Sequence, residues 1–212
     1  MRRAKRLTSG FVRGAIKRQS VWDVGNHVLY EFCRRHPGHR DDAEIIGKVW
    51  LIGRSYAAAV ERRSGRLDVT GDNFYIDVVA PAIRQGRIDR WLLPLRDLRR
   101  PDADVVLPAH ARLTALFKQI SDQEKRSLAA KYLHFHFPRA VYLFDERASR
   151  TVRQLTAGRR MKQYTHEEYD PAYARFFLRC VELHKELEQL AGRRLSPRDV
   201  DKVLLDVAAD GR

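Results

Sequence analysis

The segment "KYLHFHFPRAVYLFDERA", residues 131–148, places one lysine, two histidines and one aspartate beside a dense apolar and aromatic run. It continues a predicted helix over residues 121–137, in which Leu128, Tyr132 and Phe135 share one stripe, because residues three and four apart lie on one helix face. The proline that follows ends this helix. The segment therefore predicts two helices joined by a short apolar connection.

Polar side chains follow a second stripe of the same predicted helix. Ser127, Lys131 and His134 share this stripe, and the run "AVYLF" then leads to Asp145 at the start of the next helix. A carboxylate at a helix start meets unpaired backbone N–H groups and the positive end of the helix dipole, which stabilise its charge. Aspartate is also a preferred N-cap residue, so a purely structural role for Asp145 stays open.

Helical periodicity continues along the rest of the chain, and no alternating strand pattern exceeds four residues. The sequence therefore predicts an all-α protein. The strongest pattern, residues 43–63, is expected to be the central buried helix, and residues 102–108 are expected to be a connection. The expected helices are residues 21–33, 43–63, two short runs within 74–98, 109–120, 122–137 capped by Ser121 or Asp122, 145–156, 170–190 and 196–209, the last with a Ser196 cap and Pro197 in its first turn.

The charge of the chain indicates a polyanionic partner. The formal net charge is +14, and 32 of the 41 cationic side chains are arginine, whose planar fork matches phosphate oxygens. Residues 1–20 carry seven cations and no acid, which predicts a basic N-terminal arm or a fraying helix, with residues 21–212 as one domain. Nucleic acid is therefore the expected partner, and a solubilising tail is the alternative role for the arm.

Cys33 and Cys180 lie far apart in apolar helical patterns, which favours reduced core thiols over a disulfide or a metal site. No stretch reaches the length of apolar sequence that spans a bilayer, so we expect no membrane partner and a cytoplasmic location. We also expect a monomer.

The stretch "SLAAKYLHFHFPRAVYLFDERA", and within it "VYLFDERASRTV", resembles the catalytic segment of the helix-hairpin-helix DNA glycosylase superfamily, in particular bacterial proteins related to 8-oxoguanine glycosylases. The stretches "WDVGNHVLYEFC" and "KVWLIGRSYAAAVERR" are similar to sequences of the same group, so the resemblance extends over residues 21–155. It implies a two-lobed helical fold, with lobes at about 21–105 and 106–212 facing each other across a basic cleft.

The resemblance also implies a chemistry. A glycosylase flips a nucleotide out of duplex DNA and cleaves the bond between base and sugar. Asp145 would stabilise the positive charge that develops on the sugar, and Lys131 would attack the sugar to form a Schiff base. Water is the alternative attacker, with Asp145 as general base. The substrate would be a damaged base, or a modified base of phage DNA in antiviral defence.

Other residues are candidates for binding the substrate or the DNA backbone. Trp22, Asp23 and Asn26 form a polar and aromatic group that could hold a flipped base, although Asp23 also suits a helix cap. Ser127 and His134 complete the expected substrate-binding set. The expected DNA-binding residues are Arg126, Arg139, Arg147, Arg150, Arg153, Arg159 and Arg160.

Two other functions compete with the glycosylase. The pattern Arg179-x4-His184, repeated as Arg34-x4-His39, is typical of helical HEPN-type RNA-cleaving toxins. A non-catalytic nucleic-acid-binding module would use the same residues as caps, core and phosphate contacts. His134 and His136 diverge on a helix, so we expect no metal ion, and no cofactor is expected.

Overall fold

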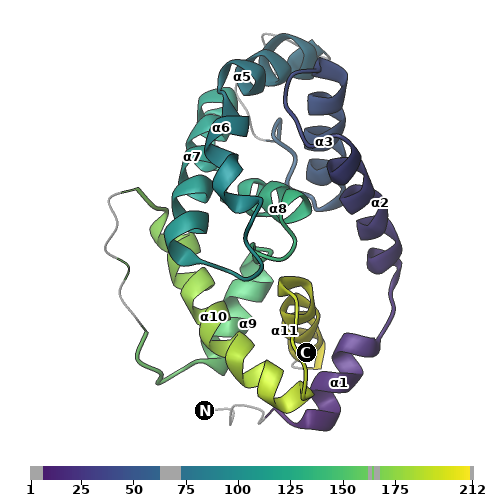
Figure 1. The fold of residues 1–212 in the computed structure, drawn as a ribbon, viewed down its shortest axis with the longest axis vertical. Helices are drawn as coiled ribbons and strands as arrows, with labels where there is room; N and C mark the ends of the chain where they lie inside the picture. Colours follow the sequence, from purple (N-terminus) through teal and green to yellow (C-terminus); the bar gives the residue numbers. More distant parts are fainter. Residues whose placement is uncertain (1–6, 63–72, 162–163, 165–167, 211–212) are drawn as a thin grey trace.

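The computed structural model describes residues 7–62, 73–161, 164 and 168–210, and all regular secondary structure in them is helical (Figure 1). The all-α prediction is thus confirmed. The longer helices are α1 (Ser9–Lys17), α2 (Val21–Arg35), α3 (Asp42–Ser55), α7 (Ala103–Ser121), α8 (Arg126–His136), α9 (Glu146–Leu155), α10 (Pro171–Ala191) and α11 (Pro197–Asp210). The short helices between α3 and α7 are η2 (Tyr75–Val79), α5 (Ala80–Gln85), α6 (Ile88–Leu92) and η3 (Leu93–Leu95).

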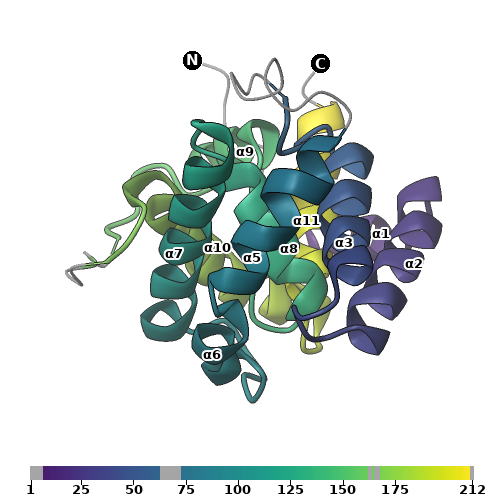
Figure 2. The same cartoon turned by 90° about the horizontal axis from the view of Figure 1, so that it is seen from above.

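Helix α8 lies at the centre of the molecule, and α2, α3 and α7 pack around it (Figures 1 and 2). Every residue from Leu128 to Phe135 is buried, which covers more than two turns and therefore all sides of the helix. The prediction that residues 43–63 form the central helix is wrong. Helix α3 leaves Trp50 45% exposed and ends at Ser55, because Ala57 adopts a left-handed backbone with φ of 50°.

A second group of helices lies below the first in Figure 1: α9 packs on α10 and α11, and α1 packs on the same two helices. Residues 137–145 connect the groups, and α7 also contacts α10. A single buried core runs through both groups. The turn between α8 and α9 thus joins the two groups, and the lobes expected at about 21–105 and 106–212 stay a prediction.

Helix α1 replaces the expected basic arm from Ser9 onward. Thr8 caps it by accepting a hydrogen bond from the N–H of Phe11, and its Val12, Ala15 and Ile16 are buried. Of the two alternatives for residues 1–20, a helix is therefore the one that residues 9–17 adopt. Residues 1–6 lie outside the described part of the chain.

Two further helix boundaries differ from prediction. Helix α7 begins at Ala103, capped by Asp102, and carries Pro108 inside it, so residues 102–108 are not a connection. Helix α8 begins at Arg126 and is capped by neither Ser121 nor Asp122. The Ser121 hydroxyl donates to the carbonyl of Phe117 at 2.8 Å, and Asp122 ends α7 with a φ of 55°.

The helix starts predicted at Asp145, Asp170 and Ser196 are confirmed. Cys33 and Cys180 are buried free thiols, as predicted. Among the described residues, no helix combines the length and the apolar character that crossing a membrane requires.

Candidate active site

Lys131 is a lysine in the middle of the central helix, with only 2% of its surface exposed. Its Nζ donates hydrogen bonds to Ser127 Oγ at 2.5 Å and to the carbonyl of Phe144 at 2.9 Å. Burial lowers the pKa of Lys131, against the opposing effect of the charges of Asp145 and Asp201. The amine is therefore shifted towards its neutral form, which is the nucleophilic one.

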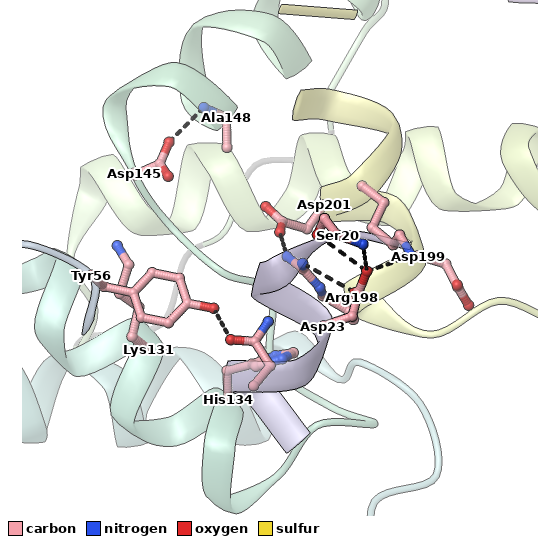
Figure 3. Close-up of polar contacts among 12 residues, drawn as sticks. Ser20, Asp23, Tyr56, Lys131, His134, Asp145, Ala148, Arg198, Asp199 and Asp201 are labelled. Carbon is pink, nitrogen blue, oxygen red and sulfur yellow. Dashed lines mark hydrogen bonds and ion pairs between the residues drawn. The ribbon is translucent and has the colours of Figure 1, made fainter. Parts of the chain in front are cut away.

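Asp145 caps α9, and its Oδ1 accepts a hydrogen bond from the N–H of Ala148 at 2.7 Å (Figure 3). No other described residue shares a hydrogen bond with this carboxylate. The side chain is half-buried, and its charge acts on Lys131, Tyr56 and Asp201. Asp145 thus combines the cap geometry that stabilises a negative charge with a charge that acts on the amine.

Helix α11 contributes a buried ion pair. Arg198 Nη1 donates to Asp201 Oδ2, and Asp201 is 5% exposed. Burial raises the pKa of Asp201 to about 6, and the positive charge of Arg198 keeps it from rising further. Arg198 and Lys202 also approach Asp23 on α2, at 3.5 and 3.3 Å. Asp201 is therefore a carboxyl group that changes charge near neutral pH.

Tyr56 follows the end of α3 and covers Lys131, whose Nζ lies 5.4 Å from the centre of the tyrosine ring. The Tyr56 hydroxyl donates to Asn26 Oδ1 at 2.6 Å. Asn26 is 3% exposed, and its Nδ2, like Nε of Arg198, has no hydrogen-bond partner among the residues that the structure describes. Buried donors without partners are rare, so these two nitrogens are unusual features of the site.

These residues form one group, termed here the polar cluster: Asn26, Tyr56, Lys131, Asp145, Arg198 and Asp201 (Figure 3). The cluster holds an amine shifted towards neutrality, a capped carboxylate, and a carboxyl group whose pKa is raised. Titratable groups whose surroundings drive their pKa values in different directions can divide acid, base and nucleophile roles at one pH.

A pocket of about 350 Å³ opens beside the cluster. It lies between the turn after α3 and the start of α8, and its lining includes Ala57, Arg62, Gln123, Glu124 and Ser127. Ser127 also contacts Lys131 Nζ, so one wall of the pocket touches the amine.

Most of the predicted substrate-binding residues come together here. Trp22 is 52% exposed, and its ring lies 5.8 Å from that of Tyr56. Asp23 has the expected capping geometry and accepts from the N–H of Ser20 at 2.9 Å. His134 is close enough for the charge of Arg198 to act on its ring, but its hydrogen bonds serve the core. Its Nδ1 donates to the carbonyl of Val141, its Nε2 accepts from a tyrosine hydroxyl, and burial lowers its pKa to about 4.

The predicted DNA-binding arginines separate into three places. Arg147, Arg150 and Arg153 lie on the exposed surface of α9, the helix that Asp145 caps. Arg126 binds Asp170 at 2.7 Å and so ties α8 to α10. The remaining predicted arginines are exposed and lie elsewhere: Arg139 in a separate pocket, Arg159 paired with Glu186, and Arg160 in the loop after α9.

The Arg-x4-His patterns do not form paired sites. Arg179 donates to the hydroxyl of Thr156 at 2.7 Å, whereas His184 binds the hydroxyl of Tyr142 at 2.8 Å. Arg34 pairs with Glu31 on the surface, and His39 is buried between Asp89 and the hydroxyl of Tyr132. In both patterns the two side chains have separate structural partners.

Sequence reasoning missed Tyr56, Arg198 and Asp201. A signal existed for Asp201, since Pro197, Asp201 and Leu204 share one face of α11 and an acid on an apolar face is unusual. No protein-family model, curated protein or solved structure matches the chain. Within the described residues, no group of three or more histidine, cysteine or acidic side chains is arranged to hold a metal ion.

Proposed function

We propose that the protein is a DNA glycosylase whose nucleophile is the amine of Lys131. The observation that carries this proposal is the buried Lys131 amine, with its lowered pKa, in the same charge neighbourhood as the helix-capping Asp145. A lysine that serves only as a surface cation has no need of this burial, and desolvation is a known means of activating an amine.

The proposed reaction begins with attack of Lys131 Nζ on C1′ of a flipped nucleotide. The bond between C1′ and the base breaks, and the base leaves with the bonding electron pair. Asp145 stabilises the positive charge on the sugar, accepts the proton that the attacking amine loses, and passes it to the base. The C1′–O4′ bond then opens as the Schiff base forms, and O4′ takes up a proton. Asp201, whose pKa is raised to about 6, is the cluster's candidate donor for it.

The pocket beside Ser127 is the proposed position of the base. Its volume of about 350 Å³ falls at the small end of the range of ligand sites. Gln123 and Glu124 supply both donors and acceptors for the edge of a base. The ring of Tyr56 lies 5.4 Å from Nζ of Lys131, and we propose that it moves when the sugar enters.

Three features support DNA as the substrate. The net charge of +14 favours a polyanion, and α9 presents Arg147, Arg150 and Arg153 beside the carboxylate that it positions. The exposed ring of Trp22, next to Tyr56, offers a stacking surface for an unpaired base. The class of substrate is therefore a duplex with a damaged or modified base, including modified phage DNA.

The test is base release from a panel of duplexes that carry oxidised, alkylated or hypermodified bases. Wild-type protein should leave abasic sites or Schiff-base products on at least one duplex, and Asp145→Asn should reduce the rate at least about 100-fold. Asp41→Asn is the matched control, because Asp41 caps α3 in the same way, with Glu44 N–H at 2.9 Å, away from the cluster. DNA binding without base release, or cleavage of RNA by the wild type, would contradict the proposal.

A further inference from the structure

A second pocket, of about 210 Å³, is lined by segments that lie far apart in the sequence. The loop before α7 contributes Arg99 and Arg100, the turn between α8 and α9 contributes Arg139, and α10 contributes Lys185 and Glu188. This basic pocket, defined by these five residues, contains none of the residues of the polar cluster.

Positive charge dominates the basic pocket. Arg100 lies 3.7 Å from Glu188, and Lys185 pairs with Glu182 at 2.7 Å on the surface of α10. Arg99 and Arg139 are exposed, and neither has a carboxylate partner among the described residues. Glu188, the carboxylate of this pocket, lies against Arg100, so Arg99 and Arg139 keep several N–H donors for an anion.

The floor of the basic pocket is held in place by hydrogen bonds. The hydroxyl of Tyr142 donates to His184 Nδ1 at 2.8 Å, and His184 Nε2 in turn donates to the carbonyl of Leu195 at 3.1 Å. Burial lowers the pKa of His184, so the ring is neutral and the arginines supply the positive charge. A floor fixed by hydrogen bonds under a cationic rim is preorganised for a ligand that has one charged end.

We propose that the basic pocket binds a phosphate group. Guanidinium forks match the oxygens of phosphate, and three of the four cations here are arginines. The pocket is smaller than typical sites for whole small molecules, so it holds a single phosphate with little of what is attached to it. That phosphate comes either from a free phosphorylated nucleotide or from the backbone of DNA, and the chemistry of recognition is the same for both.

Titrations with inorganic phosphate and with adenosine 5′-monophosphate, at constant ionic strength and followed by thermal melting, test the first source. Wild-type protein should be stabilised, and the double variant Arg99→Ala/Arg139→Ala should bind at least about tenfold more weakly. Arg175→Ala is the matched control. Arg175 is an exposed arginine of α10 that does not line the pocket, about 15 Å along the helix from Lys185.

Salt-dependent binding of an unmodified duplex without terminal phosphates tests the second source. If the pocket holds a backbone phosphate, the double variant should lower the slope of log affinity against log salt by about one, while the free phosphates have little effect. Either result supports a phosphate site, and Arg139→Glu should show the same loss of binding as the double variant. The proposal is overturned if the double variant and Arg175→Ala behave alike in both titrations.

Discussion

Replacing Lys131 by methionine should make the protein more stable and inactive. Methionine keeps the apolar stem and removes the ammonium group. The two hydrogen bonds from Nζ are worth about 1 kcal/mol each. Their loss leaves no orphan carbonyl, because Ser127 Oγ still donates to the carbonyl of Phe144 at 3.0 Å. Relief from burying a charge is worth several kcal/mol, so we expect a net gain of about 1–3 kcal/mol near neutral pH.

The gain should depend on pH with a defined sign. Because burial lowers the pKa of Lys131, the unfolded chain binds more protons than the native state between that lowered pKa and the ordinary value of 10.5. Wild-type stability therefore rises with pH in this window, and Lys131→Met lacks that contribution. The advantage of the variant should shrink as the pH approaches 10.5. Thermal melts should show an increase of about 2–10 °C near pH 7 and a smaller one near pH 10.

Lys48 supplies the contrast for this prediction. It is also fully buried, but its Nζ donates to the carbonyls of His36 and Gly38, at 2.9 and 2.5 Å, and no other described residue serves these two oxygens. Lys48→Met leaves both orphaned, at about 1–3 kcal/mol each, so it should be less stable than Lys131→Met. Finding Lys131→Met less stable than the wild type at every pH would refute the reasoning and show that Lys131 stabilises the fold through its hydrogen bonds.

Three further predictions follow from the same contacts. The carboxyl carbon of Asp201 should titrate near pH 6 in carbon-13 NMR. The native state holds this proton more tightly than the unfolded chain does. The contribution of this group to stability is therefore complete below pH 3.8 and is lost as the pH rises through about 6. Asp145→Asn removes a neighbouring negative charge and should lower the midpoint of the Asp201 titration. An unchanged midpoint would mean that the two carboxyl groups do not interact. Tyr56→Phe should cost about 1–3 kcal/mol in chemical denaturation, because Asn26 Oδ1 loses the hydroxyl at 2.6 Å, and a neutral result would mean that the bond contributes nothing. Ala57→Gly should stabilise the protein by about 0.5 kcal/mol in the same assay, because glycine relieves the left-handed backbone with φ of 50°, and a loss of stability would contradict this account of the end of α3.

Local chemistry explains which parts of the fold were predictable. The starts of α9, α10 and α11 follow from Asp145, Asp170 and Ser196, because a capping side chain bonds backbone groups within three residues. The end of α3 was not predictable in this way. Ala57 itself is neither glycine nor proline, so the sequence does not mark its left-handed backbone, although Gly53 allows Ala59 to approach the last turn of the helix closely.

The candidate site was likewise predictable only where its residues lie close together in the sequence. Lys131 and Asp145 were found together because one short segment carries both, and its periodicity fixes their relation. Asp201 and Arg198 lie more than fifty residues later, and only the packing of α11 on α9 brings them to the cluster. The central position of α8 is likewise a tertiary property, since the stronger apolar pattern lies in α3.

The most direct test of the account is borohydride reduction of the protein with a duplex from which it releases a base, followed by mass mapping of the cross-linked peptide. The account predicts a covalent adduct at Nζ of Lys131, absent from Lys131→Met even though that variant is folded and binds DNA. Base release by the wild type with no trapped adduct, or an adduct at another amine, would contradict the role assigned to Lys131.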